Sequence, residues 1–139
     1  MKQQKTIRLI ARIFMGLSAL SMLSVSLMAF SNPQAVMDLV HVHLGNTDAF
    51  SSIRGVYGGV GLTLFISIVY MLVRDVRHGL MFLCMLWGFY AVSRIMTIFT
   101  EGSLGAFGTQ WLTIESIFFS IALVLAIIYR PQPATGKQP

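Results

Sequence analysis

Four long apolar runs, separated by short charged segments, constrain the fold of this chain more than any other feature. Each run has about 18 to 20 residues, which as an α-helix spans about 27–30 Å, close to the thickness of a bilayer's hydrocarbon core. Their length and the lack of strict alternation exclude strands. We therefore expect an all-α integral membrane protein, one domain over 1–130 with a bundle of four transmembrane helices, at about 13–30, 56–73, 80–99 and 112–129.

The composition agrees with a membrane protein and excludes several classes of site. Only 11% of the residues are charged, whereas a soluble domain has about 25%. The net charge of +5 does not indicate nucleic acid, because the basic residues flank the apolar runs. The single cysteine, Cys84, excludes a disulfide framework or a cysteine-rich metal site within one chain. No apolar run contains a histidine, which excludes a haem held within the bundle by histidines. We expect no metal and no cofactor.

The basic residues also predict the orientation of the chain. They precede the first run, connect the second to the third and follow the fourth, at Lys2, Lys5, Arg8, Arg12, Arg74, Arg77, Arg130 and Lys137. Four spans place these three segments on one side, and the positive-inside rule makes that side cytoplasmic. We expect a multi-pass protein of the bacterial inner (cytoplasmic) membrane with both termini cytoplasmic. The first run exceeds the usual length of a signal peptide's apolar region, so we expect it to be retained, with cleavage as the alternative.

The connecting segments predict a little more structure. Pro33 follows residues that can cap a helix, and apolar residues then recur at helical spacing until the Gly45-Asn46 pair. This pattern predicts a short amphipathic helix over 33–44 on the outer membrane surface. The three glycines in 101–110 predict a bent, closely packed turn. We expect 131–139 to form a disordered cytoplasmic tail.

Three charges within or beside the apolar runs are the candidate functional residues. Arg54 opens the second span, Arg94 lies about 7–8 Å inside the end of the third, and Glu115 about 5 Å inside the start of the fourth. The topology brings all three to one layer of the outer leaflet, where a charge needs a partner or a cavity. A structural ion pair between Arg94 and Glu115 is one explanation. The second arginine leaves room for a small anion or a lipid headgroup.

Aromatic residues accompany these charges at helical spacing. Tyr57 follows Arg54 by three residues, and Tyr90 precedes Arg94 by four. Their rings can line a pocket while their hydroxyl groups meet the charges. The alternative is an aromatic belt at the membrane interface.

Glycines crowd the start of the second span, at Gly55, Gly58, Gly59 and Gly61. The Gly55-xxx-Gly59 spacing lets another helix approach closely. We expect these glycines to pack against helices of the same chain, since three others are present, with dimerisation as the alternative.

The segment from Ser52 to Gly61, which reads Ser-Ile-Arg-Gly-Val-Tyr-Gly-Gly-Val-Gly, resembles a known family when taken with Arg94 and Glu115. It is similar to an uncharacterised bacterial family of four-span membrane proteins, domain of unknown function four-three-four-five. The resemblance covers nearly all of the chain, from the first span to Tyr129. It implies a four-helix inner-membrane protein and supplies no biochemical activity.

Two hypotheses about function follow from these residues. The first is a protein that binds or passes a small polar or anionic ligand at the outer Arg/Arg/Glu site, with Arg54, Tyr57, Tyr90, Arg94 and Glu115 as its residues. The alternative is an accessory or assembly subunit of a larger membrane complex. The expected partners are thus the lipid bilayer, a lipid headgroup or small anion, and a second copy or a larger complex. A membrane enzyme has the least support, because we identify no catalytic residues.

Overall fold

The computed structural model describes residues 2–130, and all of the regular structure in that range is helical. The elements are α1 (Lys2–Ser31), α2 (Pro33–Asp38), α3 (Thr47–Ile53), the π-helix η1 (Arg54–Gly59), α4 (Val60–Arg74), α5 (Val76–Thr100) and α6 (Ala106–Ile128). This confirms the predicted all-α fold. The predicted tail at 131–139 lies outside the described residues.

Within the described part of the chain, four helices are long and apolar enough to cross a membrane, as the apolar runs predict. Each is longer than predicted, and the first and second depart most. In the second, α3, η1 and α4 form one continuous helix, Thr47–Arg74, of 28 residues. At 1.5 Å per residue this helix is about 42 Å long, so it exceeds the hydrocarbon core of about 30 Å.

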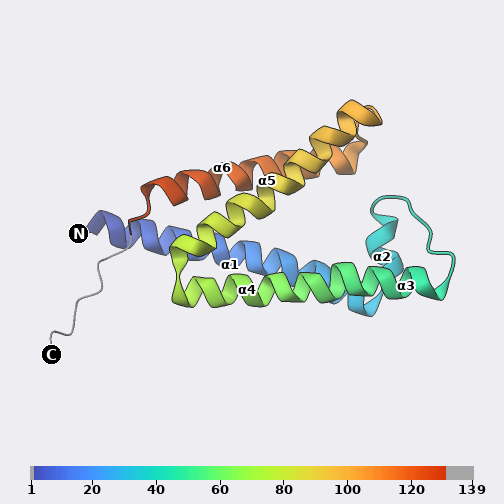
Figure 1. Cartoon of the computed structure of the whole chain (residues 1–139), viewed down its shortest axis with the longest axis horizontal. Coiled ribbons are helices and arrows are strands. Elements are labelled where there is room, and N and C mark those ends of the chain that lie inside the picture. Colours follow the sequence, from blue (N-terminus) through green and yellow to red (C-terminus); the bar gives the residue numbers. More distant parts are fainter. Residues whose placement is uncertain (1, 131–139) are drawn as a thin grey trace.

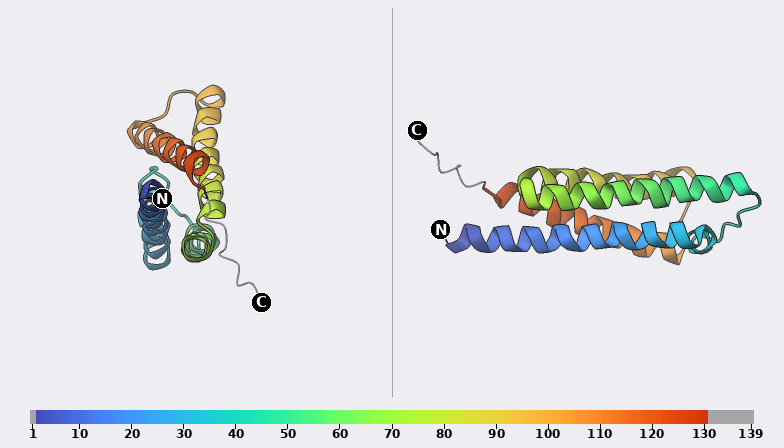
Figure 2. Two further views of the ribbon diagram at one scale, coloured as in Figure 1. Left: turned by 90° about the vertical axis from the view of Figure 1, so that its left-hand side faces the viewer. Right: turned by 90° about the horizontal axis from the view of Figure 1, so that it is seen from below.

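The four long helices form two antiparallel pairs. Helix α1 packs along α4, and α5 packs along α6. The two pairs meet at the end where α1 begins, α4 turns into α5 and α6 finishes, and they diverge toward α2 (Figure 1). Figure 2 shows the same two helix pairs from two other directions. We call the first end the terminal end and the other the α2 end.

The main core fills the half of the molecule where the pairs meet. Met15 of α1, Ile68 of α4, and Leu80 and Leu83 of α5 are all completely buried there. A second cluster lies at the α2 end, where Val36, Met37 and Leu44 pack on Ala29 of α1. The region between the two clusters is therefore free to hold a cavity.

Helix α2 is shorter than predicted, because it ends at Asp38 and not at residue 44. His41 adopts a left-handed backbone with a φ of 58°, which no α-helix can continue. The Gly45-Asn46 pair does not close a helix either. The side chain of Asn46 accepts a hydrogen bond from the backbone N–H of Ala49 at 2.8 Å, so it caps the start of α3.

The connection between α5 and α6 is also shorter than the predicted turn over 101–110. Helix α6 begins at Ala106, so Gly108 is helical and Gly105 is the residue before the first turn. Of these three glycines, only Gly102 has a positive φ, of 107°, which a residue with a side chain rarely adopts. The bend thus depends on one of the three glycines.

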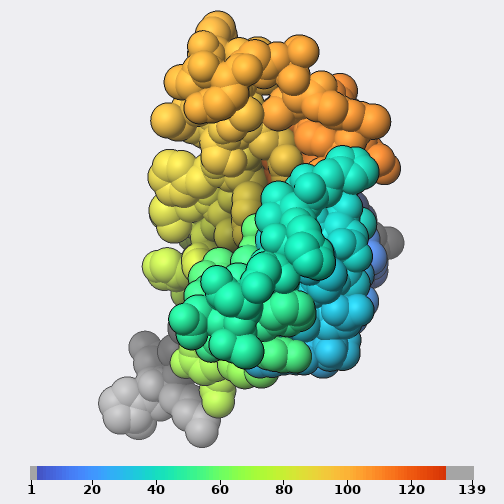
Figure 3. All heavy atoms as spheres, turned by 90° about the vertical axis from the view of Figure 1, so that its right-hand side faces the viewer, coloured from blue at the N-terminus to red at the C-terminus, as the bar shows by residue number. Residues whose placement is uncertain are grey.

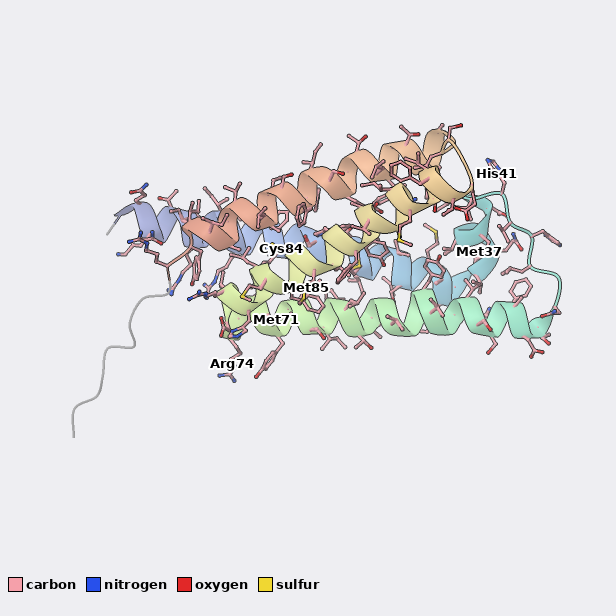
Figure 4. All side chains as sticks on the ribbon, turned by 45° about the horizontal axis from the view of Figure 1, so that its top comes forward. Met37, His41, Met71, Arg74, Cys84 and Met85 are labelled. Atoms are coloured by element: carbon pink, nitrogen blue, oxygen red, sulfur yellow. The ribbon has the colours of Figure 1, made fainter. Side chains whose placement is uncertain are left out.

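Basic residues gather at the terminal end. Lys5, Arg8 and Arg12 lie in the first turns of α1, and Arg74 ends α4. Arg77 lies in the first turn of α5, and Arg130 follows the end of α6. Figure 4 shows Arg74 there and His41 at the opposite end. The start of α1 also contacts the end of α6, since Arg8 Nε donates to the Tyr129 hydroxyl at 3.4 Å. Both ends of the described chain therefore lie on one side of the helix bundle.

Candidate functional site

Arg94 and Glu115 form an ion pair between α5 and α6. Arg94 Nε donates to Glu115 Oε2 at 2.7 Å, and Arg94 Nη2 donates to Glu115 Oε1 at 2.9 Å. Two parallel bonds of this kind fix both the distance and the plane of the two groups. The side chain of Glu115 is only 3% exposed and that of Arg94 is 24% exposed. The pair is therefore well shielded and neutral overall.

Aromatic rings of α6 extend this arrangement toward the α2 end. The guanidinium carbon of Arg94 lies 6.0 Å from the centre of the Phe107 ring, within the range of a cation–π contact. The Phe107 ring lies 6.1 Å from that of Trp111. Phe107, Trp111 and Glu115 are four residues apart, so they share one face of α6.

A cavity of about 280 Å³ lies beside the ion pair, in the space where the two helix pairs diverge. Every element except α3 contributes to its wall. It is lined by Ser21, Met22, Val25, Val36, Met37, Leu39, Val40, Val56, Tyr57, Val60, Gly61, Leu64, Trp87, Tyr90, Arg94, Phe107, Trp111 and Glu115. Its volume is near the lower limit of about 300 Å³ for typical small-molecule pockets.

Trp87 belongs to the main core and also lines this cavity. The residue is only 2% exposed, and its ring meets that of Phe118 at 4.9 Å in an edge-on arrangement. Its indole Nε1 donates to the Ser18 hydroxyl at 3.3 Å, so the buried N–H has a partner. Tyr90 stands one turn further along α5, with its ring 6.2 Å from that of Trp87.

The segment that contains α2 covers the cavity at the α2 end. Figure 3 views the molecule from this end and shows the α2 and α3 segments beside the joined ends of α5 and α6. The amide of Gln34 holds the segment in shape. Its nitrogen donates to Asp38 at 2.7 Å and to the Val42 carbonyl at 2.9 Å, and its oxygen accepts from the Leu44 N–H at 2.9 Å. Residues 39–44 are therefore an ordered turn.

Four of the five residues predicted for the site line this cavity, namely Tyr57, Tyr90, Arg94 and Glu115. Arg54 does not. Its Nε donates to the backbone carbonyl of Phe30 at the end of α1, at 3.3 Å. The predicted group of two arginines and one glutamate is thus divided. Arg94 and Glu115 lie in the cavity wall, and Arg54 lies outside it.

The predicted packing glycines also divide into two groups. A Cβ on Gly58 would lie 2.9 Å from the Phe30 ring, and a Cβ on Gly61 would lie 3.1 Å from the Cβ of Ser26. A Cβ on Gly55 or Gly59 would meet nothing within 4 Å. Gly58 and Gly61 therefore let α1 approach, while the Gly55-xxx-Gly59 pair makes no contact of this kind.

The π-helix η1 lies at this close approach. The backbone N–H of Val60 bonds back to the Gly55 carbonyl, five residues earlier, as in a π-helix. The buried hydroxyl of Ser26 on α1 donates to the Gly58 carbonyl at 2.7 Å. The wide turn changes the direction in which η1 presents its side chains, and Tyr57 faces the cavity from within it.

Residues 10–126 match a known family model, described as Domain of unknown function (DUF4345). The chain belongs to the DUF4345 family. The match includes every residue that lines the cavity, and it confirms the resemblance found in the sequence. No curated protein and no solved structure matches the chain.

Sequence patterns find part of this DUF4345 cavity and miss the rest. Trp111 and Phe107 were not predicted, although their spacing from Glu115 indicates one helix face. No sequence pattern places Val36 and Met37 in the cavity wall, because the sequence of α2 does not show which helices α2 packs against. Among residues 2–130, no group of three or more His, Cys, Asp or Glu side chains can hold a metal ion.

Proposed function

We propose that this DUF4345 protein is a membrane protein that binds a small ligand in the cavity beside Arg94 and Glu115. One observation carries the proposal: a bidentate ion pair forms part of the wall of a cavity whose other residues are mainly apolar. Pockets of this composition, with a few converging polar groups, are the usual form of small-molecule sites. Arg94 has five N–H donors, of which the carboxylate uses two, so the guanidinium retains donors for a ligand.

The two tyrosines complete the polar part of the proposed site. Tyr57 comes from η1 and Tyr90 from α5, so their hydroxyl groups belong to opposite helix pairs. A ligand between the pairs can hydrogen-bond to one hydroxyl while its remainder packs on the aliphatic wall. Both tyrosines therefore orient the ligand, and the ion pair holds its polar end.

Native mass spectrometry of the protein in nanodiscs tests this function. We expect a mass shift of ligand size on the wild-type chain. The double variant Arg94→Met with Glu115→Leu should lose it, because the polar anchor is gone. Tyr70→Phe is the matched control, since Tyr70 is 65% exposed on α4 and outside the cavity wall. A shift that persists unchanged in the double variant, or is absent from the wild type, contradicts the proposal.

We further propose that the protein resides in a bacterial inner membrane with both ends of the described chain cytoplasmic. The basic residues at the terminal end support this orientation. In a Cys84→Ser background, a membrane-impermeant thiol reagent should label Asp48→Cys and leave Lys5→Cys unlabelled in cells with a permeabilised outer membrane. The opposite labelling pattern would reverse the orientation.

An accessory role in a larger membrane complex is the second candidate function. The observation in its favour is the open space at Gly55 and Gly59, a small-xxx-small pair that lies against no helix of the described chain. Purification in a mild detergent tests it. A partner protein of fixed stoichiometry that Gly59→Leu removes supports this function, and a chain that always purifies alone contradicts it.

A further inference from the structure

We infer that the ligand of this cavity is an uncharged amphiphile that enters sideways from the bilayer. This inference rests on the proposed binding function and specifies the chemical class of the ligand. Three features of the cavity carry it: its charge balance, the chemistry of its wall and the exposure of its edge.

The charge balance of the cavity excludes an excess charge on the ligand. Its wall contains one arginine and one glutamate, which neutralise each other through two short hydrogen bonds. The second arginine that would favour an anion, Arg54, bonds to the Phe30 carbonyl and lies outside the wall. An anion in this apolar layer would have no free countercharge, and its burial would be strongly unfavourable.

The wall itself favours an apolar body with one polar end. Aromatic rings line the cavity beside the ion pair, at Tyr57, Trp87, Tyr90, Phe107 and Trp111. The faces of such rings carry partial negative charge, which repels anions. The remaining wall is mostly aliphatic, from α1, α2 and α4. A hydroxyl or carbonyl group can hydrogen-bond to Arg94 or a tyrosine hydroxyl while a short chain fills the aliphatic part.

The exposed edge of the cavity faces the region that the bilayer occupies. Val56, Tyr57 and Val60 line the cavity and are 60%, 39% and 53% exposed, and Tyr90 opposite them on α5 is 41% exposed. All four lie within helices long and apolar enough to span the membrane. At the α2 end, the segment that the Gln34 hydrogen bonds hold in shape also lines the cavity, and its Leu39 and Val40 are 45% and 46% exposed. The edge between η1 and α5 lies within the membrane-spanning helices, so it is the edge through which a ligand can enter from the lipid.

The two tryptophans of the chain provide a direct test, because both Trp87 and Trp111 line the cavity. The probes are terminally brominated decanol and terminally brominated decanesulfonate, added to the full chain in proteoliposomes. Bromine quenches tryptophan fluorescence at short range, and the sulfonate stays ionised. We expect saturable quenching by the alcohol, reversed by unbrominated decanol, and at least about tenfold weaker binding of the sulfonate.

Two variants separate binding in the cavity from simple partitioning into lipid. Leu64→Phe fills the cavity and keeps the ion pair, and the double variant Arg94→Met with Glu115→Leu removes the polar anchor. Each should weaken the binding of the brominated alcohol by about tenfold. Tyr70→Phe changes a residue outside the cavity wall and should leave the affinity unchanged. Size-exclusion chromatography and circular dichroism show whether each variant is folded.

The outcomes distinguish this inference from the proposed function. Saturable quenching by the alcohol alone supports both. Saturable binding of the sulfonate with equal or higher affinity overturns the uncharged class and leaves a ligand site in place. Quenching that never saturates with either probe, and that Leu64→Phe does not alter, overturns both.

Discussion

Arg94 and Glu115 lie on consecutive helices and join them through a two-bond ion pair of 2.7 and 2.9 Å. The carboxylate is almost completely buried, and this guanidinium is the cation that pairs with it. The same pair shapes the polar end of the cavity. Its contributions to stability and to binding therefore have to be separated by mutation.

The first prediction concerns single and double changes of this pair. Arg94→Met alone leaves a buried carboxylate without its partner, and we expect a loss of about 3 kcal/mol in the free energy of unfolding. Adding Glu115→Leu should restore stability to within about 1 kcal/mol of the wild type, since an apolar pair of similar volume can replace a buried ion pair. Equilibrium unfolding in detergent measures both. A double variant as unstable as the single one contradicts this account.

The second prediction compares two neighbouring glycines. A Cβ on Gly61 would lie 3.1 Å from the Cβ of Ser26 and 3.6 Å from the backbone of α1, so Gly61→Ala must separate the two helices. We expect it to cost about 1–3 kcal/mol. Gly59→Ala is the matched control, because its Cβ would meet nothing within 4 Å, and it should stabilise the helix by about 0.5–1 kcal/mol. Equal thermal stabilities of the two variants would contradict the observed packing.

The third prediction concerns the hydroxyl group that meets the π-helix. Ser26→Ala removes the buried donor to the Gly58 carbonyl, and we expect a loss of about 1 kcal/mol. Ser24→Ala should have little effect, since that exposed hydroxyl bonds to the Ser21 carbonyl of its own helix. Unfolding measured side by side checks the difference. A larger loss from Ser24→Ala would refute the assignment.

The fourth prediction concerns Gln34, whose amide makes three hydrogen bonds in the segment around α2. Gln34→Ala removes the acceptor of the Leu44 N–H, so this amide should exchange its hydrogen faster. We expect an increase of at least about fivefold, which corresponds to about 1 kcal/mol. Hydrogen exchange followed by mass spectrometry measures it, with the Ala49 N–H, capped by Asn46, as the internal control. An unchanged rate at Leu44 would show that the turn is held by other contacts.

The fifth prediction concerns pH and the turn between α4 and α5. The pKa of the Asp75 carboxyl lies below its ordinary value of 3.8, because the backbone N–H of His78 donates to it and the His78 ring adds a second bond. A lowered pKa in the folded state gives a stabilisation that is present above the ordinary value. It is lost as the pH falls through the lowered value.

Carbon NMR of the labelled carboxyl group in micelles measures the pKa of Asp75. His78→Ala should raise it only part of the way to 3.8, because the backbone hydrogen bond is the largest cause and stays in place. A wild-type value at or above 3.8 would contradict the cap seen at the start of α5.

The fold was largely predictable because its main determinant is local. An apolar run long enough to cross a bilayer can be read without knowing what it packs against. The extent of α2 was not predictable in this way. Apolar residues continue at helical spacing to Leu44, but the left-handed backbone at His41 and the Gln34 hydrogen bonds produce a turn. These contacts depend on side chains that meet only after the segment has folded.

The candidate site was only partly predictable because a sequence gives the depth of a residue in a span but not its direction. Arg54, Arg94 and Glu115 all lie in the part of their helices that is nearer the α2 end, but Glu115 is deeper than predicted, because α6 begins at Ala106 and Glu115 is its tenth residue. The rotation of each helix decides which of them meet, and it turns Arg54 toward Phe30. The π-helix changes that rotation within the second span, and its glycine-rich sequence alone does not reveal it.

The position of the ion pair has a consequence for the synthesis of the protein. Arg94 and Glu115 belong to α5 and α6, which are joined by a connection of a few residues at 101–105. A charge within a span opposes entry of its helix into lipid, by about 2.5–3.5 kcal/mol at the centre of the helix and by less toward its ends. Since the two helices are adjacent in the chain, they can leave the translocon as a neutral hairpin. The second half of the protein therefore carries its own means of insertion and needs no countercharge from the first.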